Sequence, residues 1–381
     1  MRVDEIREYH DVYSPMKAIY WLEDIERIRN GELIPPKFIQ LHPEAWCPHR
    51  CEYCAYRYSG WDKHGMQFFK PEWAGEKPDL SRRKPVGRLV PGVSGLPKEI
   101  ALRLPREMHE EGIEAIEITG SGEPLVYPYL LELLRQCSKW LEDIAIVTNG
   151  QFFTSQVADA VGHLTWLRFS IDACRRETYR EIHGVDCFDR VIENLRMAID
   201  RFPDTHIGVS FIVTRKNFRE VAEAARFYRE LGVRNIRFSF EYEPTGTARL
   251  RKCEIEEVRE QLEDAKRLQN SRFRVFGQVE RLDSYSRPNT DFTFCGYQHF
   301  VWNVGYDAKC YPCCIQIYHP EFAFGDLRRQ SLHEIIYGEG RRRFLERFDV
   351  TKCHPCWLRD RNKFIETLLA PERRLGHVRF V

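Results

Sequence analysis

Three cysteines stand close together directly after an apolar run, at Cys47, Cys51 and Cys54. Their number constrains the chemistry, because a structural zinc site takes four ligands, whereas a cubane 4Fe–4S cluster held by three thiolates leaves one iron open. In a chain with 13 cysteines among 381 residues, this spacing arises by chance roughly 0.015 times. The segment therefore predicts a cluster site. A zinc knuckle or three unrelated buried thiols are the alternatives.

Composition limits the kinds of partner that the chain can have. The sequence is 43% hydrophobic and 30% charged with a formal net charge of +1, so no electrostatic argument favours a nucleic acid or a membrane surface. Five of the first eight residues are charged, and no apolar window is long enough to span a bilayer. We therefore expect a cytoplasmic protein, in which 13 cysteines indicate metal ligation rather than disulfides.

A strand followed by a helix recurs along the middle of the chain. Apolar runs predict strands at 38–42, 114–119, 143–148, 166–172, 206–214 and 233–241. Helical patterns follow several of them, at 129–140, 217–231 and 254–270. This rhythm predicts an α/β fold with a partial (β/α)6 barrel over residues 38–275, whose active site lies where the strands end.

The remaining segments do not follow this rhythm. Residues 1–37 read as an N-terminal extension with one helix near 16–29, and 361–381 read as a C-terminal tail. Residues 55–96 form a long connection rich in aromatic residues, which we expect to be part of the substrate site. Residues 290–360 are poor in helical pattern, hold six cysteines and predict a small C-terminal domain.

The cysteine segment, with Tyr53 before its last cysteine, closely resembles the signature of the radical S-adenosylmethionine (SAM) enzymes. The segment Gly120-Ser-Gly-Glu-Pro124 resembles the Gly-Gly-Glu-Pro-like turn of that family, with Ser121 in place of the first glycine. The resemblance implies a 4Fe–4S cluster on the three cysteines, whose open iron binds SAM. It also implies that the turn meets the methionine part of SAM.

Further cofactor contacts are implied by the same resemblance. Ser170 and Asp172 match the Ser-Ile-Asp segment of the family, and Tyr53 would face the adenine. The chain departs from the family at His183-Gly184, where many relatives carry arginine before the glycine, so Arg176 or Arg180 would take that role. The residues predicted to bind the cofactor are Tyr53, Gly122, Glu123, Asn149, Ser170, Asp172 and Arg180.

A second group of cysteines follows the predicted barrel. Cys295, Gly305 and Cys310, then Cys353-His-Pro-Cys356, resemble the SPASM/Twitch extension of radical SAM enzymes, with pattern C-x9–15-G-x4-C, a gap, then C-x2-C. No cysteine follows Cys356, so the Twitch form with one auxiliary 4Fe–4S cluster fits better. The implied ligands are Cys295, Cys310, Cys353 and Cys356. A structural zinc site on the same four residues is the alternative.

Other cysteines have less specific interpretations. Cys313 or Cys314 could displace one of the auxiliary ligands, join a partial second cluster or act as a redox thiol. Cys137, Cys187 and Cys253 read as buried thiols on helices. Cys174, just past the fourth strand, is a candidate hydrogen-atom donor, as are Cys313 and Cys314.

The resemblance implies a radical SAM oxidoreductase. Its first cluster would reductively cleave SAM to a 5′-deoxyadenosyl radical, which removes a hydrogen atom from a small molecule, nucleotide or peptide, and the auxiliary cluster would accept an electron. An external donor such as flavodoxin or ferredoxin would supply the first electron. The alternatives are a radical isomerase, epimerase or peptide cross-linking enzyme, or a non-catalytic zinc-binding interaction protein.

Overall fold

The computed structural model describes residues 13–54, 56, 95–241, 250–277, 279, 289, 291–353 and 356–370. Within them one sheet has the strand order β10-β9-β8-β1-β2-β3-β4-β5-β6-β7 and does not close on itself. Its strands are β1 (Phe38–Leu41), β2 (Ala115–Ile118), β3 (Asp143–Thr148), β4 (Trp166–Ser170), β5 (His206–Val213), β6 (Asn235–Phe240), β7 (Arg274–Phe276), β8 (Val301–Val304), β9 (Lys309–Tyr311) and β10 (Gly325–Asp326). Neighbours from β8 through β7 are parallel. The predicted partial barrel and its six strands are confirmed.

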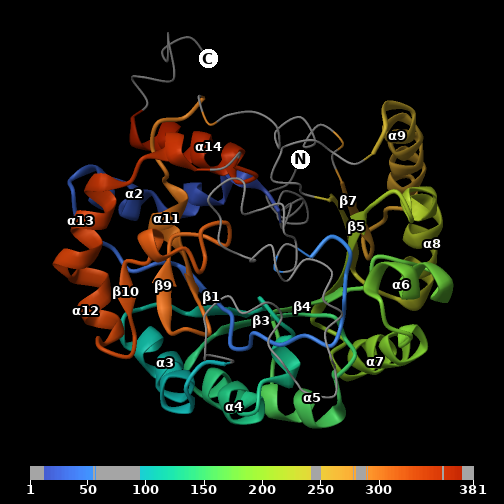
Figure 1. The fold of residues 1–381 in the computed structure, drawn as a ribbon, viewed down its shortest axis with the longest axis horizontal. Helices are drawn as coiled ribbons and strands as arrows, with labels where there is room; N and C mark the ends of the chain where they lie inside the picture. The colour runs from blue at the N-terminus through green and yellow to red at the C-terminus, as the bar shows by residue number, and fades with distance from the viewer. Residues whose placement is uncertain are drawn as a thin grey trace, which may run out of the picture.

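Helices form an arc around the outside of these strands (Figure 1). The α-helices are α2 (Leu22–Arg29), α3 (Lys98–Glu110), α4 (Leu130–Trp140), α5 (Ser155–Val161), α6 (Arg176–His183), α7 (Phe188–Arg201), α8 (Val221–Leu231), α9 (Lys252–Lys266), α11 (Tyr297–Phe300), α12 (Leu332–Tyr337), α13 (Glu339–Arg347) and α14 (Arg359–Leu369). The short 3-10 helices are η1 (Pro15–Trp21), η6 (Pro124–Val126), η7 (Phe218–Glu220), η8 (Pro320–Phe322) and η9 (Val350–Lys352).

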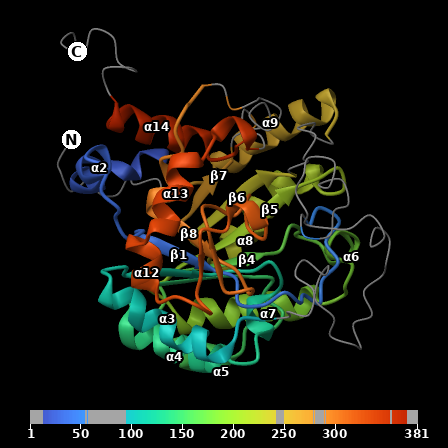
Figure 2. The same cartoon turned by 60° about the vertical axis from the view of Figure 1, so that its left-hand side comes forward.

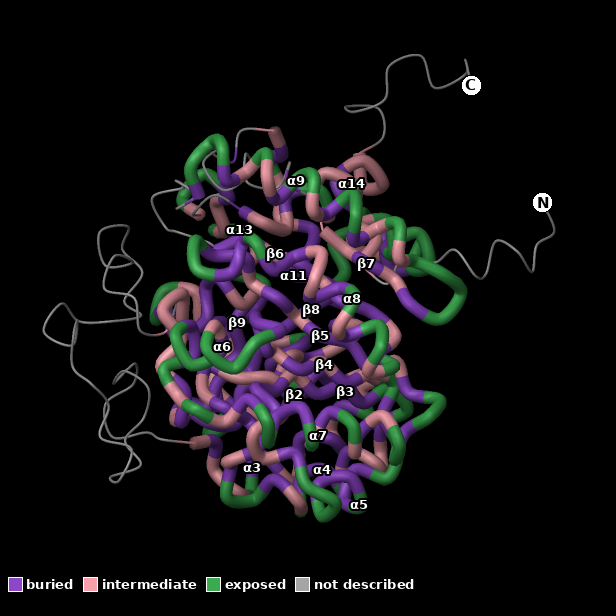
Figure 3. The backbone as a smooth tube through the Cα atoms, turned by 90° about the vertical axis from the view of Figure 1, so that its right-hand side faces the viewer, coloured by how far each residue is buried: buried purple, intermediate pink, exposed green. Residues whose placement is uncertain are grey.

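Periodicity explains why the outer helices attach to the sheet. On α4, the buried residues Leu130, Leu133, Leu134 and Cys137 recur at helical spacing and form one apolar stripe. On the strands alternate residues face this layer, and the buried strands run through the middle of the molecule (Figure 3). Among the described helices, none combines the length and the apolar character needed to cross a bilayer.

The cysteine-rich region joins the barrel sheet rather than standing apart from it. Strand β8 pairs in parallel with β1, with Phe38 opposite Val301, and β9 continues the sheet in the antiparallel sense. Although the sequence pattern there is poor in helix, α12 and α13 lie within residues 290–360. Residues 361–369, expected in a tail, belong to α14, which packs against the N-terminal helices η1 and α2 (Figure 2). Most of the 55–96 connection lies outside the described residues.

A buried histidine of α11 is expected to make the fold sensitive to acid. Neither ring nitrogen of His299 has a hydrogen-bond partner within the described residues, and the ring stacks on Phe294 with centroids 5.4 Å apart. Burial, with a smaller contribution from the charge of Arg341, lowers the pKa of His299 from 6.5 to about 3. Because its pKa is depressed on folding, the unfolded chain binds more protons below pH 6.5. Stability is therefore full above that pH and declines as the pH falls toward 3.

Replacing His299 by phenylalanine should remove this penalty. We expect His299→Phe to raise the free energy of unfolding by about 1–2 kcal/mol near pH 7.5, since two unsatisfied buried nitrogens are lost. At pH 5 the gain should grow by about 2 kcal/mol. Thermal unfolding at the two pH values measures both, with the exposed His163→Phe as control. Equal gains at the two pH values would contradict the buried, neutral histidine.

Candidate functional site

The loop that carries the first three cysteines leaves β1 and is held from two sides. On one side, the backbone N–H groups of Gly122 and Glu123 donate to the carbonyls of Glu44 and Trp46, at 3.0 and 2.8 Å. On the other, the N–H of Arg50 donates to the carbonyl of His183 at 2.7 Å, at the end of α6. These bonds place the half-buried Cys47, Cys51 and Cys54 at the carboxyl ends of the barrel strands.

The predicted Gly-Ser-Gly-Glu-Pro turn supports this loop through Gly122 and Glu123. A Cβ at position 122 would lie 2.3 Å from the carbonyl oxygen of Trp46, so only glycine lets the two backbones meet. The buried Glu123 carboxylate accepts hydrogen bonds from the hydroxyl of Thr148 and the N–H groups of Asn149 and Leu125, at 2.6, 2.8 and 3.0 Å. Burial raises the pKa of Glu123 to about 7 and outweighs these hydrogen bonds, which lower the pKa. Its oxygens therefore hold the ends of β2 and β3 together.

A Gly122→Ala change should displace the cysteine loop, because the new methyl group meets backbone that cannot rotate away. We expect SAM cleavage to fall by at least about 100-fold, as a displacement near 1 Å is enough for such a loss. Iron bound at the C-terminal site should remain. Gly340→Ala is the control, since its Cβ would lie at an ordinary 3.5 Å from the carbonyl oxygen of Phe324. Unchanged SAM cleavage in Gly122→Ala would show that the loop position does not depend on this contact.

Asp172 joins the cysteine loop to β4 and β5. It is fully buried with φ +58°, a left-handed conformation rare for residues other than glycine. Its carboxylate accepts hydrogen bonds from the Tyr53 hydroxyl and from the N–H of Ile212. Burial, and then the charge of Asp172, raise the pKa of Tyr53. The hydroxyl of Tyr53 is thus anchored within the protein, and Asp172 acts on the loop by positioning it.

His49 and His183, to which the sequence motifs assigned no role, lie close to Cys51. His183 Nδ1 is 3.2 Å from Cys51 Sγ and 3.3 Å from His49 Nδ1, and the three ligand atoms lie within 4.8 Å of one another. His183 Nε2 faces the carbonyl of Ile171 at 2.7 Å. This trio could hold a metal ion by itself. Two features of the sequence could have indicated this group. One is the histidine at position 183, where many relatives carry arginine, and the other is His49 within the cysteine segment.

The other predicted cofactor residues lie at different distances from the cysteines. Asn149 follows β3, and its Nδ2 donates to Cys47 Sγ at 3.9 Å. Ser170 ends β4, half-buried on the face opposite the main core. Arg180 is exposed on α6, where its charge helps to lower the pKa of Asp186, after the larger effects of Arg176. The structure therefore brings Asn149 to the loop and leaves Arg180 on the outside.

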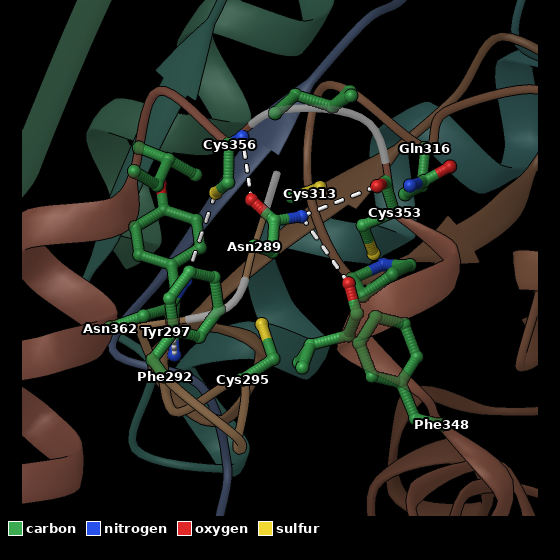
Figure 4. Close-up of a pocket in the computed structure, with 14 residues that line it drawn as sticks. Asn289, Phe292, Cys295, Tyr297, Cys313, Gln316, Phe348, Cys353, Cys356 and Asn362 are labelled. Carbon is green, nitrogen blue, oxygen red and sulfur yellow. Dashed lines mark hydrogen bonds between the residues drawn. The ribbon is translucent and has the colours of Figure 1, made fainter. Parts of the chain in front are cut away.

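Four cysteines from the C-terminal region line one cavity (Figure 4). They are Cys295, Cys313, Cys353 and Cys356. Asn289 contacts the backbone of the last two, because its Nδ2 donates to the carbonyl of Cys353 at 3.3 Å and its Oδ1 accepts from the N–H of Cys356 at 3.0 Å. Asn362 on α14 donates to Cys356 Sγ at 3.9 Å. The cysteines are thus held by residues of several segments.

The electrostatics of this cavity suit a cation or a cluster. Burial raises the pKa of Cys353 to about 11 and that of Cys356 to about 12. The pKa of Cys313 rises through burial and then through the neighbouring thiolates, including those of Cys314 and Cys295. These raised pKa values favour the protonated thiols, so four thiolates in this cavity would need a cation or a cluster among them. Four sulfur donors fit a closed 4Fe–4S cluster or tetrahedral zinc.

Cys310, predicted as the fourth auxiliary ligand, is not among them. It is fully buried on β9 in the main hydrophobic core, and burial raises its pKa together with the charges of Asp307 and Asp326. The residue with positive φ in this hairpin is Ala308, at +62°, and Gly305 is not in that region. Four residues separate Ala308 from Cys313, which is the spacing between the glycine and the cysteine of the pattern. Ala308 therefore takes the place of the pattern's glycine, three residues after Gly305. The cavity therefore presents Cys313 in place of Cys310, and the set of cysteines that binds a cluster stays a prediction.

The remaining candidate thiols divide between the barrel interior and its outside. For Cys314, burial and then the charge of Glu117 on β2 raise the pKa to about 12. Cys174 points elsewhere, because its thiol donates to Glu220 at 3.4 Å near η7. Cys137 is buried on α4 as predicted, whereas Cys253 is exposed, so its prediction as a buried thiol is wrong. Cys187 is half-buried, 3.7 Å from His49 Nε2.

Comparison with known families agrees with this arrangement. The model of the radical SAM superfamily matches residues 43–228, and that of an iron–sulfur cluster-binding domain, SPASM, matches residues 295–357. The chain therefore belongs to the radical SAM superfamily and carries a C-terminal cluster-binding domain of the SPASM type. These two domains imply 4Fe–4S clusters and SAM as cofactors. The resemblance read from the sequence is confirmed.

Individual proteins resemble the chain more remotely. Probable GTP 3′,8-cyclases of Saccharolobus solfataricus and Metallosphaera sedula are 33% and 30% identical over 168 and 156 residues, or 43% and 40% of this chain. These matches cover 53% and 48% of the relatives, so the chain spans about half of their length. Streptococcus suis SuiB bound to its precursor peptide SuiA superposes with TM-score 0.61 at 15% identity, over 93% of this chain and 82% of SuiB. The structure of anSMEcpe with bound AdoMet superposes with TM-score 0.59 at 14% identity, over 88% of this chain and 98% of anSMEcpe.

Proposed function

We propose that the chain is a radical SAM oxidoreductase. The SAM cluster would be held by Cys47, Cys51 and Cys54, and an auxiliary cluster by Cys295, Cys313, Cys353 and Cys356. The observation that carries this proposal is the presence of two separate cysteine groups beside one open barrel. When bound, the first cluster supplies one electron that cleaves SAM to a 5′-deoxyadenosyl radical, which takes a hydrogen atom from the substrate.

The chain's own residues would orient and enclose these groups. The turn at Gly122 and the pair Tyr53–Asp172 hold the cysteine loop, and Asn149 donates to Cys47 Sγ. Tyr56 lies close enough to both cysteine regions that Cys314 and Cys54 add to the effect of burial in raising its pKa. A substrate in the barrel interior would therefore lie near both regions. An auxiliary cluster there could accept an electron and give a net oxidation.

A second candidate is ring formation on a nucleotide or modification of a peptide. The match to proteins named GTP 3′,8-cyclases favours a nucleotide, whereas the shared fold with SuiB, solved with a precursor peptide, is compatible with a peptide. Incubation with GTP, or with peptides encoded by neighbouring genes, followed by mass spectrometry distinguishes a nucleotide substrate from a peptide substrate. An electron donor such as flavodoxin or ferredoxin belongs to the same proposal.

The proposed function is tested on protein purified without oxygen. We expect about eight iron atoms per chain, and formation of 5′-deoxyadenosine when SAM and dithionite are added. A colourless protein that contains zinc, no iron and no sulfide would instead support the non-catalytic zinc protein. Iron-loaded protein that never yields 5′-deoxyadenosine would also overturn the proposal.

A further inference from the structure

Charged residues occupy the face of the sheet that looks into the barrel. On β4, Leu167 and Phe169 pack in the main hydrophobic core, so Arg168 faces the opposite way. On β6, Ile236 and Phe238 belong to that core, which turns Arg237 inward as well. The register agrees, because Ser210 on β5 pairs with both Ser170 and Arg237, on the same face as Arg168.

One buried carboxyl group lies among these cations. Glu117 on β2 accepts a hydrogen bond from Gln40 on β1 at 3.1 Å. Burial raises the pKa of Glu117, and the charges of Arg168, Arg237 and Arg361 lower it. Arg361 reaches this region from α14, with its guanidinium 5.9 Å from the ring centre of Tyr297. Within the described residues no arginine forms an ion pair with this carboxyl group within 4 Å. Three guanidinium groups therefore act on one carboxyl group, which leaves an excess of positive charge.

Two of these arginines lack polar partners of their own. Arg168 Nε is buried without a hydrogen-bond partner, and its guanidinium lies 5.2 Å from the ring centre of Trp166. For Arg361, the described residues provide a ring contact with Tyr297 but no hydrogen bond or ion pair. A guanidinium that is partly removed from water and unpaired is costly, and an anion that accepts its hydrogen bonds compensates for that cost. The planar donors of arginine suit phosphate and carboxylate oxygens.

We propose that Arg168, Arg237 and Arg361 form an anion-binding site inside the barrel, which takes a phosphate or carboxylate group of the substrate. The inference rests on the proposed function for its role in turnover. It also places the substrate near the four-cysteine cavity, because the Arg361 guanidinium lies over the ring of Tyr297, which lines that cavity. The next residue of α14, Asn362, donates to Cys356 Sγ at 3.9 Å. An anionic group held there would leave the rest of the substrate directed toward the Cys47–Cys54 loop.

Binding of simple anions to the intact, cluster-loaded protein tests this site. Inorganic phosphate and glutarate are titrated separately by calorimetry in chloride buffer of constant ionic strength. We expect wild type to bind at least one of them, and Arg168→Gln and Arg361→Gln each to weaken binding at least about 10-fold. Arg168→Lys should recover part of the affinity because the charge is restored. Preference for phosphate or for glutarate identifies the chemical source of the anion.

The matched control is Arg201→Gln, an exposed arginine of α7 that pairs with Asp159 at 2.7 Å. It should bind like wild type, and circular dichroism and iron content should be unchanged in all variants. The proposal is overturned if wild type binds neither anion, or if Arg168→Gln and Arg361→Gln bind as tightly as wild type. Because binding needs neither SAM nor an electron, failure of SAM cleavage would overturn the proposed function and leave this result intact.

Discussion

A Cys51→Ala variant purified without oxygen is expected to lose 5′-deoxyadenosine formation by more than about 1000-fold, because no cluster remains to deliver the electron. Its iron content should fall by about four atoms per chain, while the C-terminal four-cysteine cavity keeps its own complement. The loop should keep its position, since the bonds from Gly122, Glu123 and Arg50 are made by the backbone and do not involve the thiol. Iron analysis and chromatography of the SAM reaction measure the two effects together.

The matched control for this variant is Cys187→Ala. Cys187 lies in the same neighbourhood, with its sulfur 3.7 Å from His49 Nε2, but outside the three-cysteine motif. It should retain iron and SAM cleavage within about twofold, as expected for a change away from the reacting groups. If Cys51→Ala still made 5′-deoxyadenosine, or if Cys187→Ala lost it equally, the assignment of the SAM cluster to this motif would be wrong.

The second large effect is expected at the C-terminal cavity, where Cys313→Ala and Cys310→Ala should differ sharply. Cys313 lines the cavity with three other cysteines, so its removal should release about four iron atoms per chain. SAM cleavage should continue, because the first cysteine loop is untouched, whereas conversion of substrate should be lost if the auxiliary cluster takes part in electron transfer. Iron content, 5′-deoxyadenosine and product are measured on the same sample.

Cys310→Ala should keep both sets of iron, since Cys310 is packed on β9 in the main core. Its effect should be confined to stability, a loss of about 1 kcal/mol for a smaller buried side chain. The opposite pattern, with iron lost from Cys310→Ala and kept in Cys313→Ala, would restore the ligand set read from sequence spacing. Zinc in place of iron at this cavity would support the structural zinc alternative.

The two cysteine regions and the interior arginines together describe how the chain could select and process a substrate. The cysteine loop is built into the ends of the barrel strands through the backbone of Gly122 and the side chain of Asp172. The C-terminal region continues the same sheet through β8. The relative positions of the two regions are therefore set by one continuous sheet, which suits a reaction that needs both.

The sequence by itself determined the order of the functional motifs along the chain and the strands that precede them. Apolar runs separated by helical patterns predicted the six barrel strands, because burial on the core face of a parallel sheet demands them. The spacing of Cys47, Cys51 and Cys54 and the turn at Gly122 identified the family. These signals are local, and each can be read from a few neighbouring residues.

Only the tertiary structure decided which side chains meet. Spacing placed Gly305 and Cys310 in the second motif, but the left-handed backbone at Ala308 and the alternation of β9 send Cys310 into the core and leave Cys313 at the cavity. The pairing of β8 with β1 is likewise invisible in the sequence, since more than 250 residues separate Phe38 from Val301. The direction of a side chain depends on backbone conformation and pairing, and spacing alone does not specify either.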